Sequence, residues 1–271
     1  MFNLPNLFTA GNMLCGALSI LFMFSGRIDL ALFSILIGAV LDFLDGFLAR
    51  KLGVSGELGK QLDSLADMVT FGLAPGLLTL QTIVLYIYLD GPRYGMSFNE
   101  FAHFQMNNWI GAVFHGVPNS MDASIKYLPF FGLVIPFFSI FRLAKFNIDL
   151  RQSDNFIGLP TPLNTIFFCF FPLLIWVNFG DEAFFSGWMS SLLNPHLIAA
   201  FGVLMSLMLI SEIPLFSMKF KNFSWHENKV RFIFLALCSL FVVLLGVWAI
   251  PLIVLLYLTM SFVFKNINQK K

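Results

Sequence analysis

Four aspartates stand close together early in a chain that is otherwise poor in charge. Asp42 and Asp45 are three positions apart, and Asp63 and Asp67 are four apart. Spacings of three and four place each pair on one face of a helix. Four converging carboxylates repel one another, so that only cations at their centre make the cluster tolerable. Carboxylate oxygens suit Mg²⁺ or Mn²⁺, whereas the histidines and cysteines that favour zinc are absent from this stretch.

The segment that joins the two pairs predicts a phosphate ligand. Gly46 follows Asp45, Arg50 lies about one turn further on, and Gly59 precedes Asp63 by one turn. The planar donor fork of arginine suits a diphosphate beside a divalent metal. Glycines on facing helices let two backbones, or a flat ligand, approach closely. Helix-capping acids and a pair of packing glycines would explain single members of this set but not the whole of it.

The composition shows where such a site must be built. Of the 271 residues 58% are hydrophobic and 11% are charged, with 35 phenylalanines, and the mean hydropathy is +0.82. A water-soluble fold cannot hide that much apolar surface, so the chain needs lipid as part of its solvent. A net charge of +1 gives no basic field for nucleic acid. Three scattered cysteines give neither a disulfide framework nor a zinc knuckle.

The apolar runs are too long and continuous for barrel strands, and they predict an all-α, polytopic transmembrane helical bundle. The last run would reach roughly 50 Å as one helix, so a turn near Gly246–Pro251 is expected to divide it, giving about eight spans. The predicted runs are Leu7–Ser25, Ile28–Leu48, Ser64–Leu89, Leu128–Phe146, Leu163–Phe179, His196–Ile213 and Phe232–Phe264.

The distribution of basic residues predicts the orientation of these spans. With the N-terminus in the cytoplasm, all of the 16 lysines and arginines except Arg27, Arg93 and Lys126 fall inside. Both termini and the aspartates are therefore expected to be cytoplasmic, and Asp90–Tyr127 becomes a long outside segment. Residues 1–271 are expected to form a single integral-membrane domain, with a catalytic core at 1–164 and additional transmembrane helices at 165–271.

The aspartates and the residues between them match a known signature. Asp42, Asp45, Gly46, Ala49, Arg50, Gly59, Asp63 and Asp67 fill every fixed position of D-x2-D-G-x2-A-R-x8-G-x3-D-x3-D. On this motif the chain resembles the CDP-alcohol phosphatidyltransferases, and the resemblance covers roughly Asn3 to Asn164.

The resemblance implies a set of roles for these residues. Two divalent ions, Mg²⁺ or Mn²⁺, would be held by the four aspartates, and Asp67 would act as general base. The alcohol would attack the lipid-proximal phosphorus of a CDP-lipid, and CMP would leave. A homodimer is also expected from the family. The residues expected to bind the CDP-lipid are Asp45, Gly46, Ala49, Arg50 and Gly59.

Further stretches resemble the membrane-embedded branch of the family that uses CDP-diacylglycerol and L-serine. This branch implies phosphatidylserine as product and a bacterial inner membrane as location. The stretches are Leu4–Asn12, Asp63–Pro75, Phe141–Asn147 and Phe156–Pro162.

The acceptor pocket is predicted at the cytoplasmic end of the fourth span. Arg142 is expected to bind the serine carboxylate or a substrate phosphate, with Lys145, Asn147, Gly158 and Pro160 beside it. Two alternatives stay open here: basic side chains that anchor to lipid headgroups, and a turn that leads into the next helix.

Other functions are also compatible with parts of this pattern. The same transfer could use glycerol 3-phosphate or an inositol phosphate as acceptor, or an ether-lipid donor. A transporter that uses intramembrane carboxylates would place them near the bilayer midplane and show an inverted repeat. A scaffold protein would have no need of four aspartates.

Overall fold

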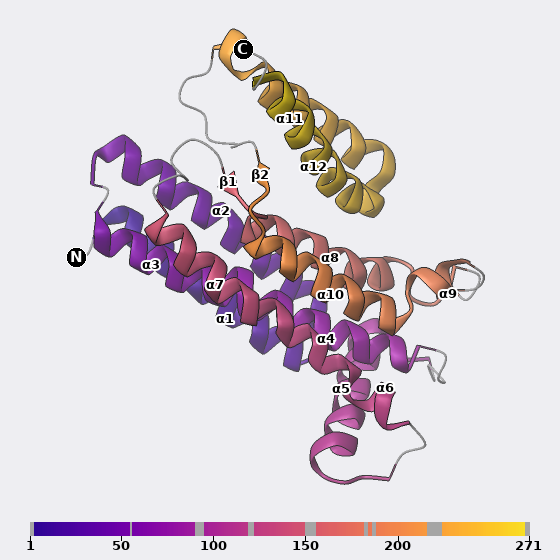
Figure 1. The fold of residues 1–271 in the computed structure, drawn as a ribbon. Coiled ribbons are helices and arrows are strands. Elements are labelled where there is room, and N and C mark those ends of the chain that lie inside the picture. The colour runs from indigo at the N-terminus through magenta and orange to yellow at the C-terminus, as the bar shows by residue number, and fades with distance from the viewer. Residues whose placement is uncertain are drawn as a thin grey trace.

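The protein is described by a computed structural model that covers residues 3–54, 56–89, 95–118, 122–149, 156–181, 184–185, 188–215 and 224–268. Helices make up most of these residues (Figure 1), which confirms the all-α prediction. Within the described ranges the β-structure is limited to two antiparallel strands of two residues each.

The helices fall into an N-terminal half and a C-terminal half. The first half holds α1 (Leu4–Phe24), α2 (Ile28–Leu52), α3 (Glu57–Asp67), η1 (Met68–Leu73), α4 (Ala74–Ile87), α5 (Phe98–Phe114), α6 (Ala123–Tyr127), η2 (Leu128–Leu133) and α7 (Val134–Ile148). The second half holds β1 (Phe156–Ile157), α8 (Thr161–Val177), α9 (Trp188–Leu192), α10 (Pro195–Ile210), β2 (Pro214–Leu215), α11 (Trp225–Leu245), η4 (Gly246–Trp248) and α12 (Ala249–Asn268).

In the part of the chain that the structure describes, five helical segments are long and apolar enough to cross a membrane. They are Leu4–Phe24, Ile28–Leu52, Glu57–Ile87, Ala123–Ile148 and Asn228–Val263, and α8 and α10 are shorter apolar helices. The last segment turns back at Gly246, whose φ of 54° suits a residue without a side chain. Consequently α11 and α12 lie side by side in Figure 1, and the predicted division of this run is confirmed.

The third span begins earlier than the sequence predicted. α3 starts at Glu57 rather than at Ser64, with Gly56 in extended conformation before it. The first turns of α3 carry Glu57, Lys60 and Gln61, so a hydropathy pattern does not include them. As a result Gly59 and Asp63 both lie inside a helix.

The segment from α3 to α4 is the centre of the bundle. Of the 18-residue apolar stretch in this segment, 78% is buried inside the protein, against 28% of the corresponding stretch in α1 and in α2. α4 approaches η2 and α7 closely, since a Cβ at Gly76 would lie 2.5 Å from Pro136 Cδ. The outer faces of α1 and α2 are apolar and exposed, as a lipid-facing surface requires.

A π-helical turn, η1, interrupts this central helix directly after Asp67. Thr165 Oγ1 of α8 lies 3.1 Å from the Phe71 carbonyl oxygen and 3.0 Å from the Thr161 carbonyl oxygen of its own helix, and Thr70 Oγ1 donates to the Asn12 carbonyl of α1 at 2.8 Å. The turn is therefore held by the helices on both sides of it.

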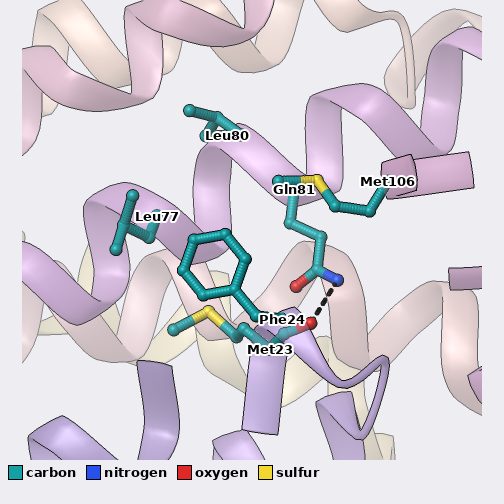
Figure 2. A pocket seen from close by; sticks show the side chains of 6 residues that line it. All are labelled: Met23, Phe24, Leu77, Leu80, Gln81 and Met106. Carbon is teal, nitrogen blue, oxygen red and sulfur yellow. Dashed lines mark hydrogen bonds between the residues drawn. The ribbon is translucent and has the colours of Figure 1, made fainter. Parts of the chain in front are cut away.

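A small pocket lies between α1, α4 and α5, at the C-terminal end of α1 (Figure 2). Its single amide side chain, Gln81, donates through Nε2 to the Met23 carbonyl at 2.9 Å. The lining carries no titratable group, so this pocket offers neither an acid nor a base. The lining residues are Met23, Phe24, Leu77, Leu80, Gln81 and Met106.

Candidate active site

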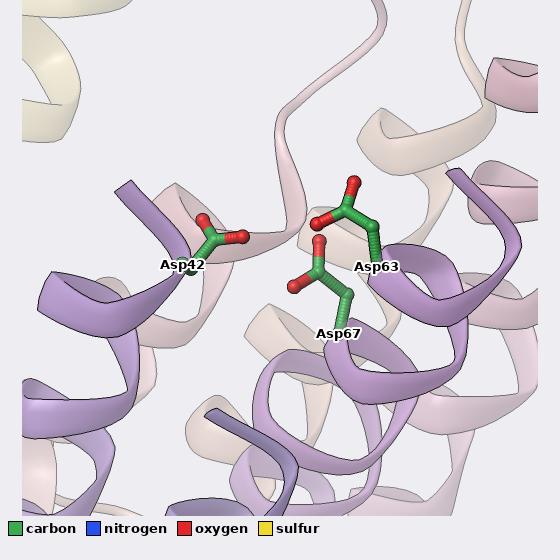
Figure 3. Close-up of side chains that lie close together, drawn as sticks. All are labelled: Asp42, Asp63 and Asp67. Carbon is green, nitrogen blue, oxygen red and sulfur yellow. The ribbon is translucent and has the colours of Figure 1, made fainter. Parts of the chain in front are cut away.

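Three of the predicted aspartates come together between α2 and α3. One carboxylate oxygen each of Asp42, Asp63 and Asp67 lies within 4.8 Å of the others. Figure 3 shows Asp42 facing the other two carboxylates across the space between the helices. The spacing of four puts Asp63 and Asp67 on one face of α3, as predicted.

The donor set of this cluster fits a divalent metal ion. Three carboxylates so close together in a membrane-embedded bundle repel one another, and a cation between them removes that repulsion. All the donor atoms are oxygens, which hard cations such as Mg²⁺ and Mn²⁺ prefer. Asp42, Asp63 and Asp67 would hold such an ion.

The fourth aspartate, Asp45, is oriented differently. Its side chain lies outside the group of three carboxylates, and the residue is only 5% exposed. Asp45 Oδ2 accepts a hydrogen bond of 2.6 Å from Thr9 Oγ1 of α1. Asp45 therefore contacts α1, although it lies on α2 together with Asp42.

Asp67 is also in contact with α1. Asn12 Nδ2 donates to Asp67 Oδ1 at 3.2 Å, and Asn12 is fully buried. Sequence reasoning gave no role to Thr9 or Asn12. The signal was present, since both are polar residues three positions apart in a helix whose other side chains are mostly apolar.

The remaining residues of the motif lie at the ends of the helices that carry the aspartates. Arg50 is exposed in the last turn of α2, and its Nη1 would be 3.4 Å from a Cβ at Gly46. Ala49 is partly buried beside it. Gly59 lies near the start of α3, where a Cβ would be 3.6 Å from Asn6 Oδ1 of α1.

One predicted acceptor residue of α7, Asn147, contacts α3, the helix that carries Asp63 and Asp67. Asn147 Nδ2 donates to Ser64 Oγ at 2.9 Å, and Ser64 directly follows Asp63. Lys145 Nζ forms an ion pair of 3.1 Å with Glu212, which lies just after α10. The end of α7 therefore bridges α3 and the end of α10.

Arg142 is only 4% exposed and interacts with the turn before α8. Its Nε donates to the Leu159 carbonyl at 3.1 Å, and its guanidinium carbon lies 5.3 Å from the ring centroid of Phe146. Both contacts fix the side chain within the bundle.

Gly158 and Pro160 belong to that turn. Gly158 has a φ of +78°, and a Cβ there would lie 2.5 Å from the Leu209 carbonyl oxygen. Its N–H donates to the Ile213 carbonyl at 2.9 Å. Pro160 is the N-cap of α8. These contacts attach the turn to the end of α10, and the role of both residues toward an acceptor stays a prediction.

The fold and the site define a helical membrane protein with a carboxylate cluster that suits a divalent metal. Residues 2–97 match the CDP-alcohol phosphatidyltransferase family. The CDP-diacylglycerol–serine O-phosphatidyltransferase of Bacillus subtilis is 32% identical over 163 residues, which are 59% of this chain and 69% of that protein. The chain belongs to the CDP-alcohol phosphatidyltransferase family.

Two other relatives are matched over about half of their own length. The CDP-diacylglycerol–serine O-phosphatidyltransferase of Helicobacter pylori strain J99 is 32% identical over 160 residues, 58% of this chain and 52% of that protein. The archaetidylserine synthase of Methanothermobacter thermautotrophicus is 28% identical over 166 residues, 60% of this chain and 54% of that protein.

Proposed function

We propose that this protein transfers the phosphatidyl group of CDP-diacylglycerol to the hydroxyl of L-serine, giving phosphatidylserine and CMP. The observation that carries the proposal is the convergence of Asp42, Asp63 and Asp67 in a chain of this family. The names of the Bacillus and Helicobacter relatives favour serine as the acceptor. An ether-lipid donor is the second candidate, because the archaeal relative is an archaetidylserine synthase.

The proposed chemistry needs positioning and charge neutralisation more than a covalent intermediate. Bound divalent ions would supply charge stabilisation for the diphosphate. Asp67 accepts the proton of the serine hydroxyl, whose oxygen forms a bond to the lipid-proximal phosphorus. The bond from that phosphorus to the oxygen of CMP breaks, and CMP leaves with the electron pair.

Each remaining residue has a proposed task in this reaction. Asp45 joins the other three aspartates as a ligand of one of two ions. The CDP part lies along Asp45, Gly46, Ala49, Arg50 and Gly59. Serine is bound by Arg142, Lys145, Asn147, Gly158 and Pro160, with its carboxylate on Arg142.

We place the reaction at the cytoplasmic face of a bacterial inner membrane, with both termini on that side, on the distribution of basic residues. A single domain over residues 1–271 and a homodimer complete the proposal.

CMP release from the purified protein in detergent tests this function. CDP-diacylglycerol and Mn²⁺ or Mg²⁺ are supplied with L-serine, glycerol 3-phosphate or inositol 1-phosphate in separate reactions. Release that depends on serine supports the proposal, and release with another alcohol only would refute the serine assignment. Release with none of the three would refute transfer from CDP-diacylglycerol to these alcohols.

A matched pair of variants on α2 tests the role of the cluster. Asp42→Asn is expected to lose metal-dependent CMP release, because it removes a charge from the group of three carboxylates. Asp29→Asn changes the acid at the other end of α2, which pairs with Arg27 at 2.8 Å, and is expected to retain activity. Equal activity of both variants would exclude the cluster as the metal site.

A further inference from the structure

The buried face of α1 carries polar side chains that the proposed chemistry does not use. Thr9 is 5% exposed, whereas Asn12 and Ser19 are fully buried. A buried polar group without a partner destabilises the fold. Thr9 and Asn12 have partners, and in both cases the partner is an aspartate of the motif.

The hydroxyl of Thr9 has two acceptors within reach. One is the Pro5 carbonyl of its own helix at 3.2 Å, and the other is Asp45 Oδ2 at 2.6 Å. A hydroxyl has one proton to donate. The shorter distance is that of a charge-assisted bond to a carboxylate, so the proton is directed to Asp45.

Asn12 contacts the helix of Asp67 at two points. Its Nδ2 donates to Asp67 Oδ1, and its backbone carbonyl accepts from Thr70, which lies one turn after Asp67. With Oδ1 held in this way, Asp67 keeps Oδ2 for the cluster. Among the described residues Asn12 Oδ1 has no hydrogen-bond partner, so the contact with Asp67 is the side chain's one hydrogen bond there.

From these contacts we infer that Thr9 and Asn12 are positioning residues that fix the orientation of two aspartates of the metal site. Thr9 holds Asp45, and Asn12 holds Asp67. The site is then built by three helices, α1, α2 and α3, although the motif lies on two of them. This inference rests on the proposed function, since it requires that the carboxylates bind a metal.

The physical reason is the freedom of the carboxylate. A side chain that makes one hydrogen bond to a fixed donor keeps a single rotamer, whereas a carboxylate without a donor must be reoriented when the metal binds. Groups that orient metal ligands in this way typically change metal affinity about 10- to 100-fold when they are removed. A role in packing alone would change stability and leave metal affinity as it was.

The test is a titration of Mn²⁺ alone into the purified chain in detergent, with the free ion measured by electron paramagnetic resonance. Thr9→Val and Asn12→Leu keep the approximate size of each side chain and remove its donor. Each is expected to weaken Mn²⁺ binding about 10- to 100-fold. Thr9→Ser keeps the hydroxyl and is expected to bind Mn²⁺ like the parent protein.

Ser19→Ala is the matched control, because Ser19 lies on the same buried face two turns beyond Asn12 and its Oγ has no partner among the described residues. It is expected to leave Mn²⁺ affinity unchanged. Thermal unfolding of all variants separates a loss of fold from a loss of affinity. If Thr9→Val does not fold, the comparison of Asn12→Leu with Ser19→Ala decides.

Three results would overturn the inference. The first is parental Mn²⁺ affinity in folded Thr9→Val and Asn12→Leu, which would leave both residues a packing role while the metal site stands. The second is equal weakening by Ser19→Ala, which would show a general effect of α1. The third is a parent protein that binds no Mn²⁺, in which case the metal part of the proposed function fails as well.

Discussion

Gly16→Ala is expected to damage the metal site without touching a carboxylate. A Cβ at Gly16 would lie 2.5 Å from Thr70 Oγ1, 2.8 Å from Thr70 Cα and 2.9 Å from its backbone nitrogen. Because backbone atoms are involved, α1 and η1 must separate by about 0.5–1 Å to restore ordinary contact distances of roughly 3.5 Å. Overpacking of this kind costs about 1–3 kcal/mol of stability.

The same displacement acts on the site. The bonds from Thr70 to the Asn12 carbonyl (2.8 Å) and from Asn12 to Asp67 (3.2 Å) both cross the gap that opens. The second bond is already long and would pass the limit of a hydrogen bond. A misplacement of about 1 Å can cost on the order of 100-fold in rate, so we expect a loss of about 10- to 100-fold in CMP release.

Gly11→Ala is the control on the same helix. Its Cβ would meet Leu41 Cδ1 at 3.2 Å, which is the end of a flexible side chain that can move aside. Both substitutions gain the same helix propensity, so the difference between them reports the contact with Thr70. CMP release and Mn²⁺ affinity are measured for both variants. Parental values for Gly16→Ala would refute the proposed coupling of α1 to Asp67.

Three further substitutions test individual assignments. Asp67→Asn is expected to abolish turnover while CDP-diacylglycerol binding stays measurable, and unchanged turnover would exclude Asp67 as the base. Arg142→Ala is expected to raise the KM for serine far more than that for CDP-diacylglycerol; an equal rise in both would assign Arg142 to phosphate. Gly158→Ala is expected to lower the unfolding temperature, because its Cβ would clash with the Leu209 carbonyl at 2.5 Å and φ is +78°; a parental unfolding temperature would contradict the contact.

Much of the fold follows from local properties of the sequence. Long apolar runs predict helices, and the excessive length of the last run predicts its division, which the structure has at Gly246. The start of α3 was not predictable in this way, since its first turns are polar. The π-helical turn at Met68–Leu73 was also missed, because it depends on partners from α1 and α8 rather than on its own residues.

In the candidate site, too, the local features were predictable from the sequence and the long-range contacts were not. Helical spacing was enough to place Asp63 and Asp67 on one face, and the structure confirms this. Thr9 and Asn12 could not be assigned from spacing, because their partners lie 36 and 55 positions away in the chain. A single polar residue in an apolar helix shows that it needs a partner but does not show which one.

The geometry of the cluster depends on how closely three backbones approach one another. Thr70 lies between α1 and α2, since a Cβ at Gly16 would meet its backbone and a Cβ at Gly38 would lie 2.8 Å from its Cγ2. The helix that carries Asp63 and Asp67 is thereby pressed against both neighbours one turn after Asp67. Aspartate has a short side chain, so carboxylates from α2 and α3 can meet only where the helices are this close. Gly16 and Gly38, which let α1 and α2 approach Thr70 closely, therefore determine the spacing of the carboxylates in the site.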